Sequence, residues 1–124
     1  MSAIHSWALL ASAFGLAGGT VHAQDRYETA RRTVEVAQEL QAAGRWSDAQ
    51  AQLIDAQNAC GTEVSARPCR LLVRYSTGYL SEKEAAGAGE RRNTLLEVAA
   101  TEYRDVLREA PQHQATLRNL VSVY

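Results

Sequence analysis

The chain has 124 residues, with 13 Lys and Arg against 14 Asp and Glu, and its net charge is −1. Every charged residue lies between Asp25 and Arg118, so an uncharged leader precedes a charged remainder of about 100 residues, enough for one small domain. Without a basic excess, a nucleic-acid binder that neutralises phosphates is excluded. The hydrophobic fraction of 46% excludes a disordered tail.

The leader has the pattern of a secretory signal peptide. An apolar run from Trp7 to Ala17 is followed by small residues, and Val21 and Ala23 stand at the −3 and −1 positions of a cleavage site. Because a bilayer span needs about 20 apolar residues, this run is too short to cross a membrane comfortably. We therefore predict a signal peptide over residues 1–23 and a periplasmic or secreted mature chain. The only n-region residue that could carry charge is His5, so an uncleaved membrane anchor and a cytosolic chain stay open as alternatives.

Helical spacing of apolar residues begins directly after the leader. It predicts a first helix from about Arg26 to Ala43, which Gly44 ends. A second helix follows, because Ser47 with Gln50 three residues later is typical of a capping box. No strand-like alternation persists anywhere in the chain, so the prediction is an all-α fold.

Pro68 is predicted to lie in the first turn of a third helix, because it lacks the N–H that would be unpaired there. It fades near Ala86, and the polar segment 87–92 is predicted to be a flexible linker.

Two more helices complete the chain. Thr94 with Glu97 predicts a second capping box and a fourth helix, which Pro111 ends. A fifth helix covers Gln114 to Tyr124, and its pairing helix is missing. We therefore expect the domain over residues 24–124 to be incomplete at its C-terminal end.

The two cysteines, Cys60 and Cys69, flank a turn-rich spacer between the second and third helices. An even number of cysteines in an exported chain predicts a disulfide, and closing so short a loop stabilises by about 2.5–3 kcal/mol. Free thiols and a zinc site are the alternatives, although two cysteines with no nearby histidine supply too few zinc ligands.

The order of large, small and aromatic residues resembles the tetratricopeptide repeat. One repeat is formed by Val36, Ala37, Leu40, Gly44, Trp46, Ala49, Leu53 and Ala56, and its second half recurs as Leu96, Ala99, Tyr103, Val106 and Pro111. In the middle repeat Gly78 is the best small position, with about nine extra residues before Thr94. The resemblance implies antiparallel helical hairpins stacked as a short α-solenoid.

The resemblance also implies a protein-binding scaffold, because in that family the first helix of each hairpin lines a concave groove. The groove-facing positions it implies are Arg31, Val34, Gln38 and Gln41, then Tyr75, Tyr79 and Glu82, and finally Arg118 and Ser122. Arginine there suits the recognition of carboxylates. Tyr75 and Tyr79, four residues apart, are either a binding platform or packing residues.

Residues that could perform chemistry are scarce. His113 is the one histidine outside the leader, and it is expected to be a solvated turn residue. The sequence contains no phosphate-binding loop, nucleophile elbow or His-Glu-x-x-His pattern. We therefore expect no catalysis, no cofactor and no metal in this segment.

The leading hypothesis is an exported adaptor that binds a protein or peptide partner in the groove. One alternative is the accessory helical region of a larger envelope enzyme, a protease or hydrolase whose catalytic domain lies beyond Tyr124. Another is a small protein that self-associates by burying its open C-terminal helix in a dimer.

Overall fold

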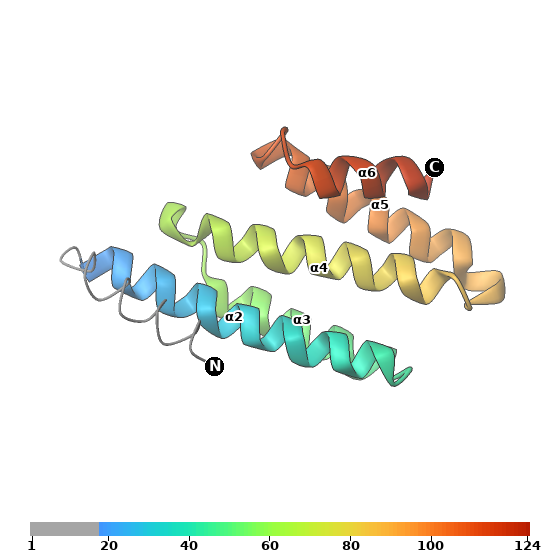
Figure 1. Ribbon diagram of the computed structural model, residues 1–124, viewed down its shortest axis with the longest axis horizontal. Coiled ribbons are helices and arrows are strands. Elements are labelled where there is room, and N and C mark those ends of the chain that lie inside the picture. The colour runs from blue at the N-terminus through green and yellow to red at the C-terminus, as the bar shows by residue number, and fades with distance from the viewer. Residues whose placement is uncertain (1–17) are drawn as a thin grey trace.

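The structure is a computed structural model and describes residues 18–124 (Figure 1). The first 17 residues, on which most of the signal-peptide prediction falls, lie outside the described part. The all-α prediction is confirmed, since no strand occurs between residue 18 and residue 124. The elements are α2 (Gly18–Ala42), α3 (Trp46–Cys60), η1 (Val64–Ala66), α4 (Arg67–Ala85), η2 (Gly89–Arg91), α5 (Arg92–Glu109) and α6 (Gln114–Val123).

The five α-helices pack against one another in two layers. Figure 1 shows α2, α4 and α6 side by side and running in the same direction, with α3 and α5 behind them running the opposite way. In agreement with that view, α4 packs against all four other α-helices, α2 packs against α3, and α5 packs against α6. We call the α2, α4 and α6 layer the front layer. α4 is therefore the central helix, and its front side is flanked by α2 and α6.

Small residues on facing helices form the core between the first hairpin and α4. Ala30 and Ala37 of α2 face Ala49 and Ala56 of α3, and all four are at most 4% exposed. Alanine at these positions lets the helices approach closely, which larger side chains would prevent. Val34 also belongs to this core, at 6% exposed, so its expected groove-facing position is wrong. Its side chain fills the hairpin interior instead.

The turn between α2 and α3 depends on Gly44, whose φ of 76° suits glycine best. The predicted capping box of Ser47 and Gln50 is wrong, because α3 already begins at Trp46, with Arg45 at its N-cap and no side-chain cap. Arg45 instead pairs with Asp48 across the first turn, at 2.6 Å between Nη2 and Oδ2. An acidic side chain in the first turn also complements the helix dipole.

The predicted linker 87–92 is a turn followed by the 3₁₀ helix η2, which continues directly into α5. Backbone bonds fix this turn, including the one from Arg91 N to Ala88 O at 3.2 Å. The helix therefore starts two residues before Thr94, and its N-cap makes no side-chain hydrogen bond. The predicted capping box of Thr94 and Glu97 is thus wrong, because the 3₁₀ turn already directs the chain into the helix.

The predicted disulfide between Cys60 and Cys69 is confirmed, with a Cα–Cα distance of 5.6 Å. It ties the end of α3 to the first turn of α4, and both cysteines are at most 1% exposed. Two arginines hold the enclosed loop from outside. Arg70 donates to Glu63 O at 2.7 Å, and Arg26 of α2 donates to the Glu63 carboxylate at 2.9 Å.

In the second hairpin, α4 and α5 approach each other closely at Gly78. A Cβ placed there would lie 2.7 Å from Cε1 of Tyr103, so only glycine fits. Beside the crossing, Arg74 pairs with Glu102 at 3.5 Å and with Asp105 at 3.1 Å. The structure thus gives a packing reason for the small residue at position 78.

Candidate interaction surface

The groove positions implied by the sequence lie on the three helices of the front layer. Arg31, Gln38 and Gln41 belong to α2, Tyr75, Tyr79 and Glu82 to α4, and Arg118 and Ser122 to α6. The structure brings Tyr75, Glu82 and Ser122 into one hydrogen-bonded cluster, and Tyr79 stacks on Tyr75. Arg118 and the three α2 residues lie outside that cluster.

On α2, the guanidinium of Arg31 is already held by two carboxylates of its own helix. It contacts Glu28 at 3.1 Å between Nη2 and Oε2, and it also pairs with Glu35. The hydrogen bond to Glu28 is the main reason why the pKa of Arg31 is raised. An incoming carboxylate would have to displace these partners, so Arg31 is a weaker anchor than the sequence suggested. Gln38 is exposed and Gln41 is half-buried.

On α4, Tyr75 and Tyr79 stack with ring centroids 6.4 Å apart and an interplanar angle of 20°. Tyr75 also contacts the rings of Tyr103 and His113, at 6.0 and 5.5 Å between centroids, so it packs between α4, α5 and the start of α6. Tyr79 is also half-buried, and its ring lies 5.0 Å from the Lys83 ammonium in a cation–π contact. Tyr75 is therefore mainly a packing residue that supports Tyr79.

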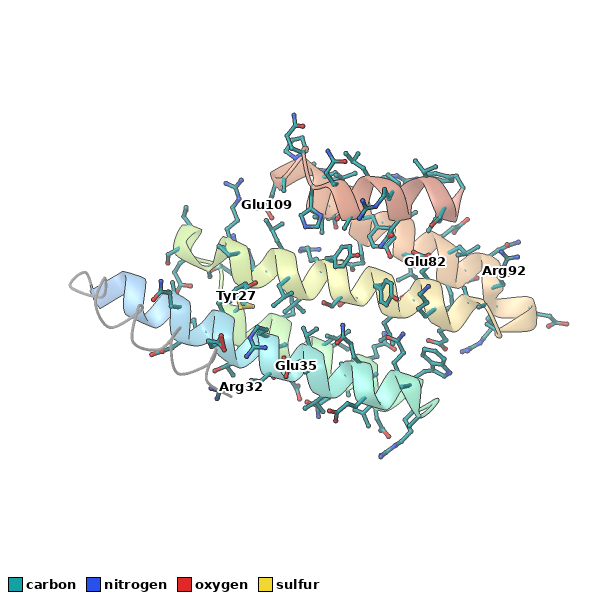
Figure 2. The ribbon with its side chains drawn as sticks, in the orientation of Figure 1. Tyr27, Arg32, Glu35, Glu82, Arg92 and Glu109 are labelled. Atoms are coloured by element: carbon teal, nitrogen blue, oxygen red, sulfur yellow. A yellow bond between two sulfur atoms is a disulfide. The ribbon has the colours of Figure 1, made fainter. Side chains whose placement is uncertain are left out.

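Glu82 lies between α4 and α6 and joins the helices of this region (Figure 2). The hydroxyl of Tyr103 donates to it at 2.8 Å. The hydroxyl of Ser122 on α6, which donates to Asn119 O at 2.8 Å, lies 3.4 Å from the other carboxylate oxygen of Glu82. Asn119, also on α6, donates to the hydroxyl of Tyr75 at 2.9 Å. These bonds fix α6 against α4 and orient the tyrosines.

The hydroxyl of Tyr103 is the buried centre of this network. The pKa of Tyr103 is raised well above its ordinary value, first because burial disfavours the phenolate and then because Glu82 accepts its hydrogen bond. The side chain is fully buried, at 0% exposed. Tyr103 therefore acts as a neutral donor that holds the Glu82 carboxylate in place.

His113 is exposed in the turn before α6, as predicted, but sequence reasoning missed its capping role and the contacts of Asn119. His113 is the N-cap of α6, where its Nδ1 accepts from Thr116 N at 3.3 Å and lies 2.7 Å from Thr116 Oγ1. Histidine is not among the common N-cap residues, so nothing local indicated this role. Asn119 pairs with Tyr75, 44 residues earlier, and no local pattern reports such a contact.

The remaining predicted position, Arg118, is exposed on α6. Among residues 18–124, no group of three or more His, Cys, Asp and Glu side chains is placed to hold a metal ion. Within the same range, no helix has both the length and the apolar character needed to cross a membrane.

Comparisons with known proteins identify no relative. No family model, no characterised protein and no solved structure matches the chain.

Proposed function

We propose that this protein is a binding scaffold that captures a protein or peptide partner on the front layer formed by α2, α4 and α6. The strongest support is the arrangement on α4, where Tyr79 is stacked on Tyr75 and flanked by Lys83 and Glu82. Tyrosine is a frequent hot-spot residue at interfaces, because it offers a large contact area together with a hydroxyl. The protein acts by binding, without turnover.

Rigidity supports this proposal. The network through Glu82, Tyr103 and Asn119 fixes Tyr75, on which Tyr79 stacks, before any partner arrives. A side chain that is already ordered loses little conformational entropy on binding, so more of the contact energy appears as affinity. Exposed charges on either side, such as Lys83 on α4 and Arg118 on α6, suit a peptide that carries an acidic residue.

The stacked-hairpin arrangement implied by the tetratricopeptide resemblance is part of this proposal. It is supported by the alternation of front and back helices and by the small residues at the helix crossings, which include Ala49, Ala56 and Gly78. In such a stack, the first helix of each hairpin faces the partner. That is the layer on which Tyr79 lies.

We also propose that the scaffold works outside the cytoplasm, in the periplasm or as a secreted protein. Disulfides persist in oxidising compartments, and the Cys60–Cys69 bond is fully enclosed between α3 and α4. The apolar leader supplies the route of export. Both features are expected of one exported chain.

Peptides selected from a phage-displayed random library against the purified protein test the proposal. For a selected peptide, Tyr79→Ala should weaken affinity by at least about tenfold, as expected for a hot-spot aromatic. Ile54→Ala is the matched control, because Ile54 is an exposed hydrophobic residue, 52% accessible, on the back-layer helix α3. Equal losses in both variants, or no loss in Tyr79→Ala, would contradict the proposal.

A further inference from the structure

The first described helix, α2, runs through the cleavage site that the leader predicts. The helix begins at Gly18, and the predicted site lies between Ala23 and Gln24. A cut at this bond removes residues 18–23 and leaves residues 24–42 as the first helix of the mature chain. The inference below rests on the proposed export of the chain, because it requires the leader to be cut.

The shortened helix keeps the contacts that hold it to the domain. Within residues 23–42, the first buried side chain is that of Ala30, which belongs to the hairpin core. Nearer the cut, Arg26 donates to the Glu63 carboxylate at 2.9 Å and to Cys60 O at 3.4 Å. Gln24 therefore becomes the first residue of a helix that the fold holds in place from Arg26 onward.

The side-chain amide of Gln24 is poorly satisfied in the fold. The side chain is half-buried, and its Oε1 is buried with no hydrogen-bond partner among the described residues. A buried oxygen without a partner loses the free energy of its hydration and gains nothing in return. A reaction that moves this oxygen breaks no hydrogen bond of it and removes an unfavourable arrangement.

Cutting after Ala23 gives Gln24 a free α-amine, which is a nucleophile, in place of a backbone amide, which is not. The amine nitrogen can attack Cδ of its own side chain. An N–Cδ bond forms, the Cδ–Nε2 bond breaks, and one amine proton leaves with the NH₂ group as ammonia. The product is the five-membered lactam of pyroglutamate. Because both groups belong to one residue, the reaction is intramolecular and needs no other reactant.

The place of Gln24 at the start of the shortened helix favours the lactam. The first N–H groups of a helix have no partner within it, so a change at the first nitrogen breaks no helix hydrogen bond. A helix N-terminus disfavours a positive charge, and cyclisation replaces an ammonium group by a neutral lactam. The ring also resembles that of proline, which is common in the first turn of a helix.

We propose that the mature chain begins with pyroglutamate at position 24, formed by cyclisation of Gln24 after the leader is cut. The modified chain has no free α-amine. An exopeptidase that requires such an amine cannot shorten it, so the start of α2 stays intact. That protects the contact of Arg26 with Glu63, which lies in the disulfide-closed loop.

Mass spectrometry of the exported protein tests this modification. The full chain with its leader is expressed in a bacterium, and the exported form is purified and reduced. We expect the mass of residues 24–124 less one ammonia, with fragmentation placing the loss on the first residue. A mature chain with unmodified Gln24 would overturn the proposal, and so would an uncut chain or a chain cut at another bond.

Gln24→Glu is the matched control, because glutamate has nearly the same shape but no amide that can release ammonia. The variant should be cut at the same bond and keep a free amine, so its mass should show no loss of ammonia. An equal loss in Gln24→Glu would place the change at another residue and overturn the proposal.

The same experiment separates this proposal from the proposed function. A cut chain with unmodified Gln24 overturns cyclisation and leaves export standing, whereas an uncut chain counts against both. Peptide binding at Tyr79 should be unchanged in Gln24→Glu, since Gln24 lies on α2, outside the α4 tyrosine cluster.

Discussion

Replacing Gly78 by alanine should destabilise the fold, although alanine is the better helix former. The added Cβ would lie 2.7 and 2.9 Å from two ring carbons of Tyr103 and 3.3 Å from the Cβ of Glu102. Tyr103 has nowhere to move, because its ring is fully buried and its hydroxyl is bonded to Glu82. The contact must therefore be relieved by separating α4 from α5.

Two effects of opposite sign decide how much Gly78→Ala changes the free energy of unfolding. Gly→Ala in a helix interior gains about 1 kcal/mol, whereas overpacking a tight core costs about 1–3 kcal/mol. With a ring that cannot yield, the cost lies at the upper end, so we expect a net loss of about 2 kcal/mol. For a domain of this size, that loss lowers Tm by about 10 °C.

Urea unfolding followed by circular dichroism measures this loss, with Gly87→Ala as the matched control. Gly87 has no heavy atom within 4 Å of its added Cβ, so that variant should be neutral or slightly stabilised. In a Tyr103→Leu background, the cost of Gly78→Ala should shrink by at least about 1 kcal/mol, because the clashing ring is gone. Equal stability of Gly78→Ala and wild type, or an unchanged cost in that background, would refute the assigned crossing.

Three further predictions concern the covalent and ionisable groups. Replacing both Cys60 and Cys69 by alanine should lower the free energy of unfolding, measured by urea unfolding, by about 2.5–3 kcal/mol. An unchanged free energy of unfolding would show that the disulfide does not restrict the conformational entropy of the unfolded chain. The raised pKa of Tyr103 means that the folded state holds its phenolic proton more tightly than the unfolded state, so this contribution to stability is complete below pH 10 and lost as pH rises above it. Absorbance titration should find one tyrosine that ionises only on unfolding, and Tyr103→Phe should abolish that step. Burial raises the pKa of Glu102, so its contribution to stability is largest below about pH 4.5 and is lost as pH rises through the folded-state value; Glu102→Gln should flatten that part of the stability profile.

The helices were predictable from local chemistry, whereas the exact starts of α3 and α5 were not. Gly44 and Pro68 mark a stop and a start that depend only on backbone geometry, so the pattern placed them correctly. Ser47 and Thr94 match a capping box in sequence, but the preceding turns directed the chain into each helix one or two residues earlier. A capping motif is a local preference, and the surrounding packing overrides it.

The candidate surface was predicted in part. Tyr75, Glu82 and Ser122 converge, because α4 and α6 both belong to the front layer, whereas Arg118 is exposed outside the cluster. Val34 lies in the hairpin core, since helical spacing alone does not distinguish a stripe that faces a partner from one that faces the next helix. The bond from Asn119 to Tyr75 spans 44 residues, beyond the range of any sequence pattern.

The most direct test of the binding-scaffold proposal is a map of backbone amide shifts by NMR as a library-selected peptide is added. We predict that the largest shifts will lie on the front layer, centred on Tyr79 and Lys83 and extending to Gln38 of α2 and Arg118 of α6. Shifts concentrated on α3 and α5, with the α4 tyrosine cluster unchanged, would contradict it.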